Sequence, residues 1–317
     1  MGVEAVTLRK AIGLGALGLG VSMSFVLLGG MGDRAMTIAQ SVPSSTATPT
    51  QVQSNRAYVP LSDAVIAEML KLAGVTRDDV VYGLGSGDGR LAIAAVKNAG
   101  ARRSVGIETN PALVQASQTN AQQAGVGDRA QFLQQDLLQA DVREATVVTL
   151  DASSETALKL RSKLSSLKPG TRIVSRTAAL GDWKPDKTIT VPGTAPQMLY
   201  YWVVPERLAG DWQGRVEYAS GRSQSYTLRF TQQFQQVKGE AIADGKKYTI
   251  PNIALTGDRL TFSRSETIQG QQGVIQFDGR VEGNTLKGTA GIKWGILARN
   301  FPIMAQRSPT LQGSLMQ

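Results

Sequence analysis

The 317-residue chain contains no cysteine and no histidine. The missing cysteines exclude disulfides and a thiol nucleophile, and the two absences together exclude an ordinary zinc site and a histidine general base. A metal held by carboxylates alone would need clustered acids, and the sequence shows no such cluster, so we predict no metal site. Any catalysis must therefore use carboxylates, hydroxyls, amines, backbone groups or an organic cofactor.

The chain is also poor in aromatic residues, at 6%, and its net charge is +9. Its basic residues are scattered and form no long run interleaved with aromatics, so nucleic acid is not expected as a partner. The hydrophobic content of 42% indicates a globular protein. A chain of this length can form two domains, each with a core of its own.

Charged residues are absent from residues 11–30, AIGLGALGLGVSMSFVLLGG. Such a run can span a bilayer as a helix or serve as the apolar region of a signal peptide, and both alternatives stay open for residues 1–39. Arg9 and Lys10 precede the run and favour a cytoplasmic N-terminus. We expect a membrane-anchored or exported protein, with the side of the membrane left open. Residues 40–56 are rich in Ser, Thr, Pro and Gln and predict a disordered linker.

A glycine-rich turn separates a short apolar segment, residues 79–82, from a helix-forming segment, residues 91–97. Glycines let the backbone approach a ligand closely, and the N-terminus of a helix offers free N–H groups, so this corner predicts a nucleotide-like ligand. The spacing is G-x-G-x-G, at Gly85, Gly87 and Gly89. It fits neither the dinucleotide fingerprint G-x-G-x-x-G nor a P-loop.

Two acids follow the glycines at the ends of predicted strands. A strand over residues 103–107 ends at Glu108, where a carboxylate can accept hydrogen bonds from both hydroxyls of a ribose. A strand over residues 130–133 leads to Asp136, where an acid can meet an adenine amino group. Together with the glycine spacing, the two acids indicate a site for an adenosine-containing ligand.

Helical segments alternate with these strands, which indicates an α/β fold with a parallel sheet. The predicted helices cover residues 62–73, 91–97 and 111–124. A further strand over residues 146–150 ends in Asp151. The carboxyl ends of parallel strands line one crevice, so Asp151 is expected either to face that crevice or to cap the helix that follows it.

Residues 58–186 resemble a family of small class I S-adenosylmethionine-dependent methyltransferases that includes protein-lysine methyltransferases. The stretches that carry the resemblance are Tyr58-Val59-Pro60, VVYGLGSGDGRLAIAA (80–95), GARRSVGIETNPALV (100–114), EATVVTL (144–150), LKPGTRIVS (167–175) and GDWKPD (181–186). The resemblance implies S-adenosylmethionine as the methyl donor. It also implies the Rossmann-like, seven-stranded sheet of that family over residues 57–205.

Carried over position by position, the resemblance also implies which residues bind the cofactor. They are Tyr58, Gly83, Gly85, Ser86, Gly87, Asp88, Glu108 and Asp136. Residues 85–88 would hold the methionine part, Glu108 the ribose and Asp136 the adenine side. Tyr58 lies where the family has a loop that covers the cofactor. Gly83 stands where the family usually has an acid that holds the cofactor's amino group.

The chain departs from the family in the part of the crevice expected to receive the methyl acceptor. Where bacterial members often read Tyr-Leu-Leu-Pro with an Asn further on, this chain has Asp151-Ala152-Ser153-Ser154 and Ala157. A Ser-His-aromatic-Asp-like pattern near the fifth strand is replaced by Ser175, Arg176, Ala178 and Ala179. Methyl transfer depends on alignment and on exclusion of water. We predict a methyltransferase of protein lysine side chains, with Asp151 as the residue that faces the acceptor.

From Leu208 onward the pattern changes to short alternating segments separated by turn signals, with no helical periodicity. Strands are predicted over residues 215–218, 226–231, 236–242, 247–250, 259–263 and 274–281. This spacing indicates an antiparallel β-sandwich or barrel domain over residues 208–307, followed by a tail over residues 308–317. The sequence offers no chemistry in this domain, so we expect it to bind a partner or to pack on the first domain.

Three functions stay open at this point. The first is a methyltransferase, favoured by Glu108, Asp136 and the glycines. The second is a binding or scaffold protein that keeps the cofactor fold without turnover, favoured by Gly83 and the altered crevice. The third is an exported envelope protein whose β domain carries the function, favoured by the charge bias at the N-terminus.

Overall fold

The computed structural model describes residues 58–309, except for residues 177, 194, 218–222, 244, 269–270 and 295–296. The predicted membrane or signal segment, residues 11–30, and the predicted linker, residues 40–56, lie outside the described residues. Within the described part, every helix is too short or too polar to cross a membrane. The chain from Arg56 onward is one compact unit that contains two sheets.

The first sheet has seven strands in the order β3-β2-β1-β4-β5-β7-β6. Its strands are β1 (Val80–Leu84), β2 (Arg103–Glu108), β3 (Ala130–Gln134), β4 (Val147–Leu150), β5 (Arg172–Ser175), β6 (Lys187–Val191) and β7 (Gln197–Val203). Strands β1 to β5 are parallel, whereas β7 is antiparallel to both β5 and β6. The predicted Rossmann-like sheet is confirmed, and its strand order reverses between β1 and β4.

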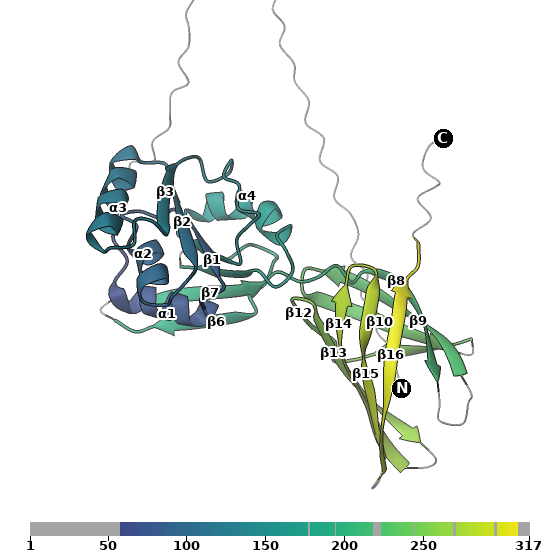
Figure 1. The fold of residues 1–317 in the computed structure, drawn as a ribbon. Helices are drawn as coiled ribbons and strands as arrows, with labels where there is room; N and C mark the ends of the chain where they lie inside the picture. The colour runs from purple at the N-terminus through teal and green to yellow at the C-terminus, as the bar shows by residue number, and fades with distance from the viewer. Residues whose placement is uncertain are drawn as a thin grey trace, which may run out of the picture. The chain divides into compact units, whose positions relative to one another are not determined.

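Helices cover both faces of this sheet (Figure 1). They are α1 (Asp63–Ala73), α2 (Arg90–Lys97), α3 (Pro111–Gln123) and α4 (Ser154–Ser165). Helices α1 and α2 pack on the face that carries Val81 and Val147, whereas Leu160 of α4 packs on the opposite face, with Val148. Because both faces are covered, β1 and β4 are buried along their whole length, which explains why their sequences are mostly apolar and do not alternate with charged residues.

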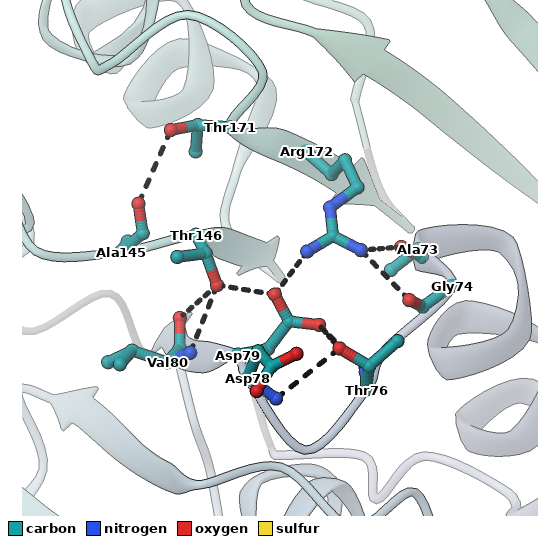
Figure 2. A network of polar contacts seen from close by, with 10 residues as sticks. All are labelled: Ala73, Gly74, Thr76, Asp78, Asp79, Val80, Ala145, Thr146, Thr171 and Arg172. Atoms are coloured by element: carbon teal, nitrogen blue, oxygen red, sulfur yellow. Dashed lines mark hydrogen bonds and ion pairs between the residues drawn. The ribbon is translucent and has the colours of Figure 1, made fainter.

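The amino ends of the strands are tied together by the carboxylate of Asp79, which directly precedes β1 (Figure 2). It accepts hydrogen bonds from the backbone N–H of Thr76 at 2.7 Å, the hydroxyl of Thr76 at 3.0 Å and the hydroxyl of Thr146 at 2.7 Å. Arg172, the first residue of β5, forms an ion pair with Asp79 and donates to the carbonyl of Gly74 at 2.8 Å. One polar network therefore joins β1, the start of β4, β5 and the end of α1.

This network makes the stability of the first domain depend on pH. Burial alone would raise the pKa of the Asp79 carboxyl, but hydrogen bonds from Thr146 and Thr76 and the charge of Arg172 hold that pKa below its ordinary value. The stabilisation is therefore fully present above the unfolded pKa of about 4, and it is lost as the pH falls through the lower folded pKa.

We predict that Asp79→Asn lowers the free energy of unfolding at pH 7 by about 2 kcal/mol, because Arg172 loses its charged partner. Urea unfolding at pH 7 and at pH 3 would measure the difference in unfolding free energy between wild type and the variant. This difference should be smaller at pH 3. The control is Asp141→Asn, which removes an exposed carboxylate paired with Arg143 and should leave the midpoint almost unchanged. A difference from wild type that is equally large at both pH values would contradict the prediction.

The second sheet has nine antiparallel strands in the order β11-β10-β9-β8-β16-β15-β14-β13-β12. The strands are β8 (Gly210–Glu217), β9 (Ser223–Gln233), β10 (Gln236–Ala243), β11 (Lys246–Ile250), β12 (Ala254–Thr256), β13 (Arg259–Ile268), β14 (Gln271–Glu282), β15 (Thr285–Trp294) and β16 (Leu297–Arg307). The sheet curls until β12 contacts β10 and β11 contacts β13 (Figure 1). It is a half-barrel, which agrees with the barrel alternative of the sequence-based prediction.

Trp212 anchors one end of the half-barrel core. Its side chain is fully buried, and its indole N–H donates to the carbonyl of Leu208 at 2.8 Å. The guanidinium of Arg307, at the end of β16, lies 4.2 Å from the centre of the indole ring. The first and last strands of the half-barrel are therefore joined by packing as well as by the β8–β16 ladder.

The turn between β9 and β10 contacts the first domain through Phe234. Its ring stacks on Trp183 with 5.2 Å between the ring centres and 10° between the ring planes. The side chain of Gln235 donates to the carbonyl of Lys184 at 2.6 Å. Phe234 thus packs against the core of the first sheet, next to the segment that follows β5.

Candidate active site

The turn after β1 is fixed against both neighbouring strands. The N–H groups of Gly85 and Ser86 each donate to the carbonyl of Ile107 at 3.0 Å, and the N–H of Asp151 donates to the carbonyl of Leu84 at 2.9 Å. Gly85 has a φ of 79°, and a Cβ there would lie 2.1 Å from the carbonyl oxygen of Asp151. Only glycine fits at this position, so the turn and the end of β4 are in direct backbone contact.

Glu108 ends β2 with its carboxylate against the glycine turn. Its Oε1 accepts hydrogen bonds from the N–H groups of Thr109 at 2.8 Å and Asn110 at 3.0 Å. Within the described part of the chain, Oε2 accepts one hydrogen bond, from the N–H of Gly87 at 3.0 Å. A carboxylate oxygen has two lone pairs, so Oε2 can still accept a hydrogen bond from a ribose hydroxyl. The ribose-binding role of Glu108 stays a prediction, with one acceptor position of Oε2 open among the described residues.

The hydroxyl oxygen of Ser86 is buried and has no hydrogen-bond partner among the described residues. Leaving a buried hydroxyl without a partner costs free energy, so this atom fits a site that a polar ligand completes. Gly83 lies nearby, within β1. A Cβ there would come no closer than 3.4 Å to the hydroxyl oxygen of Thr149 and 3.7 Å to the Cβ of Ser86. The position where the family usually has an acid could therefore hold a Cβ without a clash.

Tyr58 covers the glycine turn, and a Cβ at Gly87 would lie 2.3 Å from its ring. The Tyr58 hydroxyl donates to Oδ1 of Asp88 at 2.9 Å and accepts the N–H of Asp88 at 3.2 Å. Burial raises the pKa of Tyr58 to about 12, so its hydroxyl stays protonated. Asp88 also forms an ion pair with Arg90 at 2.7 Å. The Asp88 carboxylate, predicted to hold the methionine part of the cofactor, is therefore bonded to Tyr58 and Arg90.

Asp136 lies just after β3 and is exposed. Its Oδ1 accepts the N–H of Leu138 at 2.8 Å, which orients the carboxylate at the start of a turn. The preceding residue, Gln135, donates its N–H to the carbonyl of Glu108 at 3.0 Å, so the two predicted acids lie on adjoining backbone segments. The adenine-binding role of Asp136 stays a prediction.

Asp151 forms an ion pair that no motif in the sequence predicts. Nη2 of Arg176, which directly follows β5, donates to both carboxylate oxygens of Asp151 at 2.7 Å. Nη1 of Arg176 donates to the side-chain oxygen of Gln197, the first residue of β7, at 3.4 Å. Ser153 is the cap of α4, and its hydroxyl accepts the N–H of Thr156 at 3.2 Å. Of the two roles left open for Asp151, helix capping therefore belongs to another residue.

The strand order places these groups on the side of the sheet where the carboxyl ends of the parallel strands lie. Asp136, Glu108 and the glycine turn follow β3, β2 and β1, on one side of the point where the strand order reverses. Asp151, Arg176 and Gln197 lie at the ends of β4, β5 and β7, on the other side. The crevice at such a reversal binds ligands in α/β folds. Throughout the described residues, acidic side chains do not gather in a group of three or more that could hold a metal ion.

Known methyltransferases resemble the first domain of this chain. A family model described as the ANTKMT methyltransferase domain matches residues 83–187. A protein-lysine N-methyltransferase of Saccharolobus islandicus (strain REY15A) is 37% identical over 151 residues, which are 47% of this chain and 94% of that protein. A Homo sapiens protein, named as a lysine N-methyltransferase of an ATP synthase component, is 29% identical over 161 residues, which are 50% of this chain and 68% of that protein.

A solved structure, an RNA methyltransferase from Salinibacter ruber in complex with S-adenosyl-L-homocysteine, is 46% identical. It has a TM-score of 0.45 and covers 47% of this chain and 96% of its own.

The chain therefore belongs to the class I S-adenosylmethionine-dependent methyltransferases, in the family that includes protein-lysine N-methyltransferases. It is a methyltransferase with S-adenosylmethionine as its cofactor, and a half-barrel follows its catalytic domain. The residues present fit this cofactor, because the Ser86 hydroxyl and one lone pair of Glu108 have no partner in the described part of the chain and both lie beside the glycine turn. The predicted family and cofactor are thus confirmed.

We predict that Glu108→Ala weakens the binding of S-adenosylhomocysteine by about 20-fold, because a charge-assisted hydrogen bond from a ribose hydroxyl to the carboxylate is lost. Calorimetric titration of the full chain would measure the dissociation constant. Glu144→Ala, which removes an exposed acid paired with Arg103, is the matched control and should bind as wild type does. Equal affinities for wild type and Glu108→Ala would remove Glu108 from the ribose site.

Proposed function

We propose that this enzyme methylates lysine side chains of a protein. Two relatives that match about half of the chain, at 37% and 29% identity, are lysine N-methyltransferases by name. When bound, S-adenosylmethionine supplies a methyl group on a positively charged sulfur; an amine nitrogen takes that methyl as the sulfur–carbon bond breaks, and the bonding electron pair stays on sulfur.

The observation that carries the proposal is the position of Asp151. Its backbone touches the glycine turn at Gly85, and its carboxylate pairs with Arg176 after β5, whereas Glu108 ends β2 on the other side of the reversal in strand order. A carboxylate there can accept a hydrogen bond from the N–H of an entering amine and orient the nitrogen lone pair toward the cofactor. Tyr58 covers the glycine turn and helps to exclude water from this region. A desolvated crevice also favours the neutral, reactive form of a lysine amine.

Methyl transfer to lysine can be tested directly with radiolabelled S-adenosylmethionine. The full chain is incubated with cell membranes, soluble protein and RNA in separate reactions, and labelled protein is hydrolysed to amino acids. We expect the label in methylated lysine, and it should disappear when Glu108→Ala replaces wild type. Label in nucleotides, or in amino acids other than lysine, would overturn the proposed acceptor class.

We further propose that residues 11–30 attach the enzyme to a membrane. The support is the sequence itself, since the run is uncharged, long enough to span a bilayer and preceded by Arg9 and Lys10.

The full chain should stay with membranes during alkaline extraction, and a chain without residues 2–39 should be released. Protease added to intact cells then reports the side: a protected C-terminus would exclude the exported envelope alternative. Release of the full chain by alkali would overturn the attachment.

A further inference from the structure

Arg176 and Asp151 form an ion pair that stability does not explain. The two side chains are only 18% and 19% exposed, and Nε of Arg176 is buried without a hydrogen-bond partner among the described residues. Burying an ion pair costs about as much desolvation energy as the pair gains, and a buried donor without a partner adds to that cost. Two apolar side chains of similar size would pack in the same place with less cost.

The pair at the other end of β5 shows what a structural ion pair looks like in this domain. Arg172 pairs with Asp79 and also donates to the carbonyl of Gly74, and Asp79 accepts further hydrogen bonds from Thr76 and Thr146. That network joins four elements and leaves its carboxylate fully bonded. The Asp151–Arg176 pair joins only the ends of β4, β5 and β7, beside the crevice.

The charge of the pair matters for an amine acceptor. A carboxylate without a counter-ion attracts the ammonium form of lysine, which has no lone pair and cannot accept a methyl group. An unpaired carboxylate would therefore stabilise the bound ammonium form of the substrate and lower the rate of methyl transfer. When Arg176 binds both oxygens of Asp151, each oxygen still has a second lone pair that can accept a hydrogen bond, and the carboxylate loses most of its net charge.

We propose that Arg176 is a positioning residue of the acceptor site, which holds the Asp151 carboxylate and cancels its charge so that the acceptor amine enters in its neutral form. This inference rests on the proposed lysine methylation. It assigns a specificity-determining role to a position where the chain departs from its family, and the role can be separated experimentally from stability and from cofactor binding.

The test compares Arg176→Gln, Asp151→Asn and the double variant Asp151→Asn/Arg176→Gln with wild type. The full chain methylates poly-L-lysine at saturating S-adenosylmethionine, and kcat and KM for the polymer are measured. Arg176→Gln leaves an unpaired carboxylate, so we expect both KM and kcat to fall about tenfold. Asp151→Asn leaves an unpaired guanidinium, so KM should rise about tenfold. The double variant should return KM to within about threefold of wild type.

Three further measurements separate the alternatives. The double variant should melt at or above the wild-type temperature, and Arg176→Lys should keep a KM close to that of wild type. The surface variant Arg143→Gln, which breaks an exposed ion pair, should match wild type in every measurement. The affinity for S-adenosylhomocysteine should be the same in all variants. Loss of that affinity in Arg176→Gln would place the pair in the cofactor site and overturn the inference.

A rise in KM together with a lower melting temperature for Arg176→Gln would show that Arg176 has a structural role. This result would also overturn the inference. If Arg176→Gln does not fold, the test rests on the comparison of Asp151→Asn with the double variant. The inference requires KM for poly-L-lysine to be higher in Asp151→Asn than in the double variant. An active wild type with unchanged KM in the folded variants overturns this inference alone. A wild type that methylates no lysine overturns the proposed function, and this inference falls with it.

Discussion

The contact between Gly85 and the carbonyl oxygen of Asp151 sets the geometry on which the active site depends. A Cβ at residue 85 would lie 2.1 Å from that oxygen, so the backbone of the glycine turn and the end of β4 occupy adjoining space. The same turn is tied to β2 through two N–H groups that share the carbonyl of Ile107. The end of β2 next to Glu108, the glycine turn and the backbone of Asp151 are therefore positioned by one compact backbone arrangement.

Strand β5 carries an arginine at its first residue and another directly after its last, and the two serve opposite purposes. Arg172 belongs to a network in which Asp79 is fully bonded, at the edge of the sheet away from the crevice. Arg176 lies at the crevice edge, with one donor unpartnered among the described residues and a carboxylate that can still accept a hydrogen bond. The domain thus gains its stability at one edge and keeps incompletely bonded polar groups at the other, which is what a site that binds and aligns a substrate requires.

Features that depend on chemistry within a few residues can be predicted from the sequence. Features that depend on which strands lie side by side, and in which register, cannot. The cap at Ser62 and the left-handed stop at Gly74 are predictable because each acts within a few residues. The Asp151–Arg176 pair joins residues 25 apart in the chain and follows from the register in which Leu150 lies beside Ser175. Strands β15 and β16 are absent from the sequence-based prediction, and in β15 small inward residues such as Gly288 weaken the alternation. The alternation of apolar and polar residues also does not reveal whether a curled sheet closes into a barrel.

The half-barrel contacts the first domain through the turn between β9 and β10. Phe234 adopts a φ of 53°, a costly conformation for an aromatic residue, and its ring stacks on Trp183. Trp183 belongs to the segment that continues from Arg176 toward β6, and the indole N–H of Trp202 in β7 donates to its carbonyl at 2.9 Å. The same strand supplies Gln197, its first residue, to Arg176, so β7 carries both the contact with Trp183 and the contact with Arg176. The positive φ of Phe234 belongs to the two-residue turn that joins β9 to β10, where Gln233 pairs with Gln236, and this turn directs the ring onto Trp183.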